Sequence, residues 1–156
     1  MSMEVRILPF NQLPIHDLYQ SLKLRQDVFM LEQACLFSDM DNLDLKAWHV
    51  VGKFEKQVVA YTRIFGPGEY YPGFTSIGRV VASPAHRKCG YGRKIMEVSI
   101  QYCLNQWPDI PVKIGAQQYL EAFYQSLGFE STGPTYIEDG IPHVYMTLDQ
   151  KKSPLS

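Results

Sequence analysis

The chain has 156 residues, 46% of them hydrophobic, and its 15 Lys and Arg residues nearly balance its 16 Asp and Glu residues. At this length a single globular domain buries roughly 70% of the surface of its unfolded chain, so neither disulfides nor a structural metal are needed. Because the net charge is −1 and basic residues never form a run longer than two, no nucleic-acid partner is expected.

The N-terminus lacks an apolar signal region and no stretch of about 20 apolar residues occurs, so we expect a cytoplasmic protein without a membrane partner. The three cysteines form no C-x-x-C pair and the four histidines lie far apart, so reduced thiols and no metal site are expected. Without repeats or linkers, the sequence predicts a single domain over residues 1–150 and a disordered tail at residues 151–156.

The first half of the chain alternates between strand and helix patterns. A short strand is predicted at residues 4–9, and apolar residues at helical spacing predict a long helix from residue 14 to about residue 36. An acidic, irregular stretch at residues 38–44 follows. Residues 48–54 and 58–65 then predict two strands of a hairpin.

The second half continues this alternation. A strand rich in β-branched residues is predicted at residues 76–82, and a helix at residues 92–107 is expected to end before Pro108. The remaining predictions are a strand at 111–116, a helix at 119–127 closed by Gly128, and strands at 129–135 and 143–148 around a turn at 138–142. This order predicts a mixed α/β sheet covered by helices.

The most informative motif, R-x-x-G-x-G, lies between the strand at 76–82 and the next helix and reads Arg87-Lys-Cys-Gly90-Tyr-Gly92. Its glycines let the backbone approach a ligand, and the free N–H groups at a helix start suit a phosphate group. The spacing matches neither the triphosphate nor the dinucleotide loop. The motif therefore indicates a diphosphate site, with an ordinary turn before a helix as the alternative.

This motif resembles the acyl-CoA pyrophosphate loop of the GNAT N-acetyltransferase superfamily. A second stretch in the correct order, Ala122-Phe-Tyr124-Gln-Ser-Leu-Gly128-Phe129, is similar to the family signature A-x-x-F-Y-x-x-x-G-F. Two further stretches, Arg25-x-x-Val28-Phe29-x-x-Glu32-Gln33 and Glu138-Asp-Gly-Ile-Pro-His143, resemble the ElaA subfamily. The resemblance covers about residues 4–148.

The resemblance implies an α/β GNAT fold with a mixed, mostly antiparallel sheet of six to seven strands, about four flanking helices and splayed central parallel strands. It also implies transfer of an acetyl group from acetyl-CoA to a primary amine of a small molecule or peptide, by direct attack in a ternary complex. No metal and no cysteine nucleophile are required, and a homodimer is left open.

Two other functions stay open. One is a noncatalytic CoA-binding regulatory module that kept the loop. The other is an acyl-homoserine-lactone-synthase-like acyltransferase, because R-x-x-V-F-x-x-E also resembles the start of those enzymes. The R-x-x-G-x-G loop favours free CoA over a carrier protein.

The resemblance also assigns residues to acetyl-CoA. The backbone of Val80, Val81 and Ala82 would hold the pantetheine arm and polarise the thioester carbonyl. The diphosphate would be held by Arg87, Lys88, Cys89, Gly90, Tyr91, Gly92 and Arg93. A plain strand and plain surface charges are the alternatives, and an asparagine frequent in the family is replaced here by Tyr119.

Three residues are candidates for proton transfer. Tyr124 would lie near the CoA sulfur and protonate the departing thiolate, since a phenol is neutral at pH 7; core packing is the alternative. His143 would deprotonate the incoming ammonium, because histidine titrates near neutral pH, unless it is a buried strand residue. Glu32 is a further candidate base.

The acceptor site is predicted between the end of the first helix, with its acidic loop, and residues 138–143. Its candidate residues are Arg25, Glu32, Arg79, Glu138 and His143. For Arg25 and Glu32, seven residues apart on one helix, a mutual ion bridge is favoured over an acceptor-site pair. Arg79 would brace its strand or face an anionic substrate.

The acidic residues of the 38–44 stretch, Asp39, Asp41 and Asp44, begin like a calcium loop. Leu45 occupies the place of a ligand, and no Gly/Glu pattern follows. We interpret the stretch as a solvated loop beside the amine site.

Overall fold

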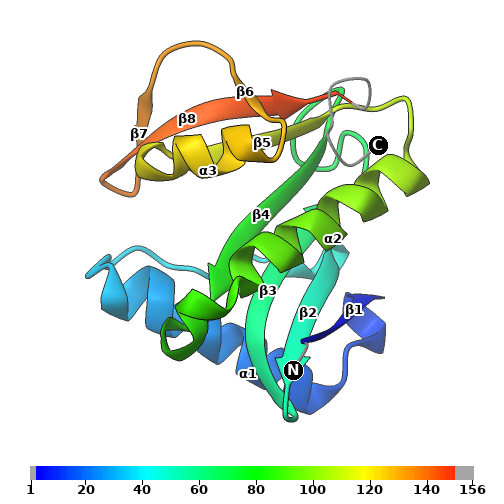
Figure 1. Ribbon diagram of the computed structural model, residues 1–156, viewed down its shortest axis with the longest axis vertical. Coiled ribbons are helices and arrows are strands. Elements are labelled where there is room, and N and C mark those ends of the chain that lie inside the picture. Colours follow the sequence, from blue (N-terminus) through cyan, green and yellow to red (C-terminus); the bar gives the residue numbers. More distant parts are fainter. Residues whose placement is uncertain (1–2, 150–156) are drawn as a thin grey trace. The chain divides into compact units, whose positions relative to one another are not determined.

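Figure 1 shows the computed structural model, which describes residues 3–149. The chain divides into two compact units, the first made of the residues up to Ile64 and of Arg79–Ser99, the second of Phe65–Gly78 and the residues from Ile100 onward. The single domain over residues 1–150 stays a prediction, and the predicted tail at 151–156 lies outside the described residues. Within the described part of the chain, no helix has the length and apolar character that a membrane crossing requires.

The elements follow the predicted order up to α3 (Glu121–Ser126), after which three strands, and not two, complete the chain. The strands are β1 (Glu4–Pro9), β2 (Trp48–Phe54), β3 (Gln57–Phe65), β4 (Thr75–Ala82), β5 (Val112–Gln117), β6 (Glu130–Ser131), β7 (Tyr136–Glu138) and β8 (Ile141–Leu148). The α-helices are α1 (Ile15–Arg25), α2 (Tyr91–Gln106) and α3 (Glu121–Ser126). Short helical segments of other types are η1 (Phe10–Gln12), η2 (Gln26–Glu32), η3 (Leu43–Lys46), η4 (Pro84–Cys89) and η5 (Gln118–Leu120).

The strands form one mixed sheet in the order β1-β2-β3-β4-β5-β8-β6, with β7 also paired to β8. Strand β4 pairs with β5 in parallel at Thr75–Val112 and Ser76–Lys113, whereas β5, β6 and β7 are antiparallel to β8. The predicted mixed, mostly antiparallel sheet is confirmed. It has eight strands instead of six to seven, because the short strands β6 and β7 both pair with β8.

The first unit is built around the β2–β3 hairpin, which the sequence predicted. Its two turn residues, Glu55 and Lys56, both have positive φ, 50° and 67°, as expected of a two-residue turn that follows the twist of the strands. Helix α1 and its extension cover this hairpin through a core of buried apolar side chains, among them Leu13, Leu24, Val28, Val51, Val58, Tyr61 and Val81.

The predicted helix from residue 14 to about 36 is wrong in its second half. Helix α1 ends at Arg25 and continues as the π-helix η2 to Glu32. Hydrogen bonds from Gln33 N to Val28 O and from Cys35 N to Met30 O, 3.2 and 2.9 Å long, span five residues. Apolar spacing over so few residues does not distinguish an α-turn from a π-turn.

The predicted strand at residues 129–135 is also wrong. Only Glu130–Ser131 forms a strand there, while β7 is a strand that was not predicted. Gly133, with φ 95°, and Pro134, which has no N–H to donate, lie between β6 and β7 and interrupt the pairing of this segment with β8. The turn before β8 is accordingly shorter than predicted and consists of residues 139 and 140.

Candidate active site

The R-x-x-G-x-G motif forms the connection from β4 to α2. Segment η4 is followed by Gly90, which has a left-handed conformation with φ 75°, and helix α2 begins at Tyr91. A Cβ atom at Gly90 would meet no atom within 4 Å, so the backbone conformation, and not crowding, calls for glycine. The loop thus leads directly into the N-terminus of a 16-residue helix, where an anion is favoured.

The cationic side chains of this loop are accessible to solvent. The Arg87 and Arg93 side chains are 48% and 47% exposed, and Lys88 is exposed as well. Arg87 forms an ion pair with Glu32, and its hydrogen bond lowers the pKa of that carboxyl. The partner of Glu32 is therefore Arg87, and the predicted bridge between Arg25 and Glu32 is wrong.

A residue with an unusual backbone conformation directly precedes the predicted pantetheine segment, Val80–Val81–Ala82, in strand β4. Arg79 lies inside the strand with φ 50°, which is unusual for a residue other than glycine. Val81 is buried, while Val80 and Ala82 are half-buried. A Cβ atom at Gly92 would lie 3.9 Å from the Ala82 Cβ, so the end of the segment and the start of α2 are neighbours.

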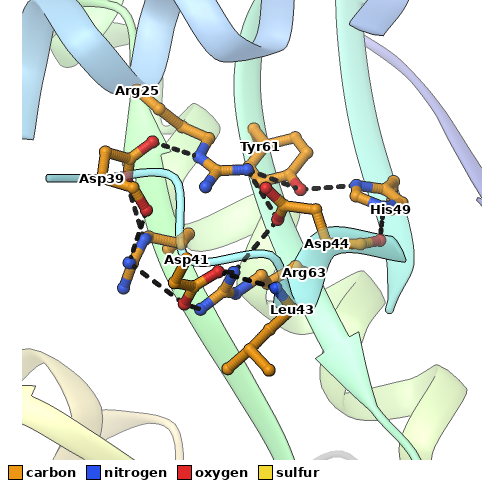
Figure 2. Close-up of polar contacts among 9 residues, drawn as sticks. Arg25, Asp39, Asp41, Leu43, Asp44, His49, Tyr61 and Arg63 are labelled. Carbon is orange, nitrogen blue, oxygen red and sulfur yellow. Dashed lines mark hydrogen bonds and ion pairs between the residues drawn. The ribbon is translucent and has the colours of Figure 1, made fainter. Parts of the chain in front are cut away.

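A cluster of opposite charges lies between α1, the 38–44 stretch and strands β3 and β4 (Figure 2). It consists of Arg25, Asp39, Asp41, Asp44, Arg63 and Arg79 and is called the buried ionic network below. Arg25 donates from Nε to Asp39 Oδ2 at 2.8 Å and from Nη1 to Asp44 Oδ1 at 2.9 Å. Arg63 donates to the same Asp44 oxygen at 3.0 Å and to Asp41 Oδ2 at 2.6 Å. Three arginines thus face three aspartates.

The interpretation of the 38–44 stretch as a solvated loop is wrong, because Asp39 and Asp44 are only 9% and 7% exposed. Burial alone would raise the pKa of Asp41, but the hydrogen bond and charge of Arg63 lower it to about 2. The pKa of Asp44 is lowered against burial in the same way by Arg25 and Arg63. These carboxylates are charged because arginines surround them.

His49 and Tyr61 extend the network with neutral groups. His49 Nε2 lies 2.8 Å from the main-chain oxygen of Asp44, which can only accept, so Nε2 carries the proton. Burial lowers the pKa of His49 and keeps the ring neutral, so Nδ1 accepts the hydrogen bond of Tyr61 at 2.6 Å. Burial also raises the pKa of Tyr61, which stays a donor.

In the second unit, α3 carries Tyr124 into a buried position with 6% of its surface exposed. Its ring packs edge-on against Phe123 and Phe129, with centroid distances of 5.1 and 6.0 Å. Burial raises the pKa of Tyr124 above the ordinary phenol value, so the hydroxyl stays protonated. The general-acid role stays a prediction.

The structure brings together His143 and Glu138, two of the predicted acceptor residues. His143 Nδ1 lies 2.7 Å from the Ile141 main-chain oxygen and therefore carries a proton in the neutral ring. The lone pair is then on Nε2, which is 3.6 Å from Glu138 Oε2. His143 is 6% exposed, and its role as a base stays a prediction.

An aromatic cluster beside these residues was not predicted. Tyr136 stacks on Tyr145 with a centroid distance of 4.3 Å, and Tyr71 meets Tyr145 edge-on at 5.9 Å. The Lys113 Nζ lies 4.5 Å from the Tyr145 centroid. A Cβ atom at Gly115 would lie 2.5 Å from the Tyr136 hydroxyl, so the lack of a side chain at Gly115 lets this hydroxyl come close to the backbone. The alternation of His143 and Tyr145 along one strand was the available signal.

The predicted site residues fall into both units. The first unit holds Arg25, Glu32, Arg79, the pantetheine segment and residues 87–93, whereas Tyr124, Glu138 and His143 belong to the second. Arg25 is 1% exposed, and its carboxylate partners are Asp39 and Asp44. The roles of all these residues in binding and catalysis stay predictions.

The chain belongs to the GNAT acetyltransferase family, since residues 33–150 match the model of the acetyltransferase (GNAT) domain. Within this family it is similar to ElaA of Escherichia coli, with 39% identity over 144 residues, 91% of this chain and 94% of that protein. Both the superfamily and the ElaA-like subfamily predicted from the motifs are confirmed. Family membership supports an acyltransferase.

Comparison with solved structures agrees with this family assignment. The crystal structure of Escherichia coli ElaA has a TM-score of 0.87 at 38% identity, over 94% of this chain and 99% of that one. An acyl-CoA N-acyltransferase from Pseudomonas aeruginosa gives the same TM-score and coverage at 36% identity. A CoA-dependent acyl-homoserine lactone synthase, BjaI, has a TM-score of 0.76 at 14% identity, over 97% of this chain and 86% of that one, which shows a common fold alone.

Proposed function

We propose that the protein is an N-acetyltransferase that transfers the acetyl group of acetyl-CoA to a primary amine of a small molecule or peptide. The observation that carries this proposal is the loop after β4. It combines a left-handed Gly90, the N-terminus of α2 and the exposed cations Arg87, Lys88 and Arg93. Backbone N–H groups and exposed guanidinium groups together suit the two charges of a diphosphate.

Acetyl-CoA would extend from this loop along β4. The backbone of Val80, Val81 and Ala82 offers main-chain donors and acceptors to the amide groups of pantetheine. A main-chain N–H directed at the thioester oxygen stabilises the negative charge that develops there during attack. Cys89, Tyr91 and Gly92 complete the segment that would lie against the diphosphate.

The transfer would proceed by direct attack. The amine nitrogen forms a bond to the thioester carbonyl carbon, the C–S bond then breaks, and the sulfur leaves as a thiolate. The nitrogen, positively charged after the attack, loses one proton to water and becomes the neutral amide. Tyr124 donates its proton to this thiolate, and burial keeps the phenol protonated until the thiolate forms. No covalent enzyme intermediate is required.

The acceptor must arrive as an ammonium ion and lose a proton before attack. Of the two candidate bases, Glu32 is disfavoured because its pKa is lowered by Arg87. His143 has its free lone pair on Nε2, next to Glu138 and the rings of Tyr136 and Tyr145, and aromatic faces attract cations. This surrounding supports a cationic amine as acceptor.

A calorimetric titration with acetyl-CoA and a panel of amines assayed by CoA release test the function. Gly90→Val is expected to abolish acetyl-CoA binding, because its left-handed φ strains a β-branched residue and moves the backbone. Gly68→Val is the matched control, since Gly68 has φ 72° and equally open surroundings. Unchanged affinity in a folded Gly90→Val protein would contradict the loop assignment. Binding without turnover of any amine would favour a noncatalytic module.

The role of His143 is tested by kcat/KM and the melting temperature of the His143→Ala variant. If His143 is the base, kcat/KM falls at least about tenfold while the melting temperature stays close to that of the wild type. A lowered melting temperature with kcat/KM nearly unchanged would assign His143 to the scaffold.

A further inference from the structure

The side chain of Arg79 is held at two points by a single residue, Asp39. The Arg79 Nε lies 2.7 Å from Asp39 Oδ1, and Nη2 donates a hydrogen bond of 2.8 Å to the Asp39 main-chain oxygen. Arg79 Nη2 is also 3.4 Å from Asp41 Oδ2. The guanidinium therefore forms an ion pair with the carboxylate of Asp39 and a hydrogen bond with its main-chain oxygen, so the carboxylate contributes its charge and the backbone a directional contact.

Asp39 is itself fixed from the opposite side. Its second oxygen, Oδ2, accepts a hydrogen bond of 2.8 Å from Nε of Arg25, the last residue of α1. The Asp39 and Arg25 side chains are 7% and 1% exposed. Asp39 thus links the end of α1 to the middle of β4. Its contact with Arg25 is buried on both sides, and the Arg79 side chain is 26% exposed.

The linked position in β4 is a strained one. Arg79 has φ 50° inside a strand, a conformation that costs free energy for any residue with a Cβ and persists only where surrounding contacts favour it. The next three residues are the pantetheine segment. A return of Arg79 to the ordinary extended conformation would redirect the N–H and C=O groups of that segment.

We propose that Asp39 and Arg79 form a clasp that sets the backbone direction of Val80–Val81–Ala82, so that Asp39 is a positioning residue for acetyl-CoA. The inference rests on the proposed function, in which this segment holds pantetheine. It gives the 38–44 stretch a role in presenting the acyl donor, in place of the solvated loop beside the amine site that the sequence predicted.

The test compares Asp39→Asn, which keeps the shape of the side chain and removes its charge, with Asp17→Asn. Asp17 is 3% exposed, lies in α1 of the same unit and forms an ion pair of 2.8 Å with Lys53. Asp39→Asn is expected to raise the Kd and KM for acetyl-CoA by about 5- to 30-fold, as loss of support for a strained residue predicts. The KM for the amine should stay the same, and Asp17→Asn should lose only stability.

Amide hydrogen exchange without ligand provides a readout that does not depend on activity. The amides of Val80–Val81–Ala82 are expected to exchange faster in Asp39→Asn and at the wild-type rate in Asp17→Asn. Arg79→Lys, which keeps the charge but cannot occupy both contacts with one nitrogen, should show an intermediate effect. It also serves as the test variant if Asp39→Asn does not fold.

The outcomes separate the clasp from the proposed function. Unchanged exchange and unchanged acetyl-CoA affinity in a folded Asp39→Asn protein would overturn the clasp while leaving the function intact. Equal losses in Asp39→Asn and Asp17→Asn would overturn it too, because they would reflect general loosening. A wild-type protein that binds no acetyl-CoA would overturn the function, and with it the role of the clasp in binding.

Discussion

Two arginine-rich regions of the first unit differ in how their charges are surrounded. In the buried ionic network, Arg25 and Arg63 are each 1% exposed, and each contacts two aspartates. In the loop before α2, the Arg87 and Arg93 side chains are about half exposed, at 48% and 47%, and their carboxylate partners, Glu32 and Glu97, are exposed as well.

This difference separates charges that hold the fold from charges that can meet a ligand. A buried guanidinium has lost its hydration, and only its carboxylate partners compensate, so it cannot exchange them for a ligand without a large cost. An exposed ion pair contributes little to stability and is easily exchanged for a diphosphate. Residue type alone would have placed all four arginines in one class.

The largest expected effect is a loss of stability when the buried ionic network is disrupted. Arg25→Met is predicted to lower the free energy of unfolding by about 3–5 kcal/mol, because Asp39 and Asp44 each lose a partner while staying buried. Urea denaturation measures the change. Arg93→Met is the matched control at an exposed arginine and should alter stability by less than about 0.5 kcal/mol. Similar values for the two variants would contradict the distinction between the regions.

The Tyr124→Phe variant tests whether the buried Tyr124 serves only in core packing. Tyr124→Phe removes one oxygen and keeps the packing with Phe123 and Phe129. We expect kcat to fall about 10- to 1000-fold, equivalent to about 1.4–4 kcal/mol, with nearly unchanged acetyl-CoA affinity. Steady-state kinetics combined with calorimetry measure both. Wild-type turnover in the variant would assign Tyr124 to core packing.

Acid should weaken the buried ionic network. The pKa of Asp41 is lowered from 3.8 to about 2 in the folded protein, so its stabilising contribution is present above about pH 4 and is lost as the pH falls toward 2. With allowance for solvent screening, this contribution is about 1–2 kcal/mol. Free energies of unfolding measured between pH 6 and 3 should therefore depend less steeply on pH in Asp41→Asn. Equal slopes would contradict the lowered pKa.

The smallest effect is expected at the exposed pair of Glu32 and Arg87. Glu32→Gln should change the free energy of unfolding by less than about 1 kcal/mol, since exposed ion pairs contribute little. It should leave kcat unchanged and slightly tighten acetyl-CoA binding, because Arg87 loses a competing carboxylate. Chemical denaturation and acetyl-CoA titration provide the measurements. A drop in kcat of more than tenfold would instead identify Glu32 as a base.

Features that depend on neighbouring residues could be read from the sequence. The β2–β3 hairpin, helix α2 ending before Pro108 and the glycine-containing loop before α2 follow from alternation, helix-stop and glycine rules that act over a few residues. Each of the two motifs that resemble the family likewise consists of residues that lie close together in the sequence. The fold class and the position of the R-x-x-G-x-G loop were therefore available without a structure.

Only the tertiary structure decided which charged side chains form ion pairs. Arg25 pairs with Asp39 and Asp44, 14 and 19 residues away, and not with Glu32, whose partner Arg87 lies 55 residues further along. Helical spacing made Arg25 and Glu32 look like a pair, but the change from α1 to the π-helix η2 and the path of the 38–44 stretch gave each a different neighbour. Charge pairing depends on where distant segments are brought by packing of the core, and no local pattern carries that information.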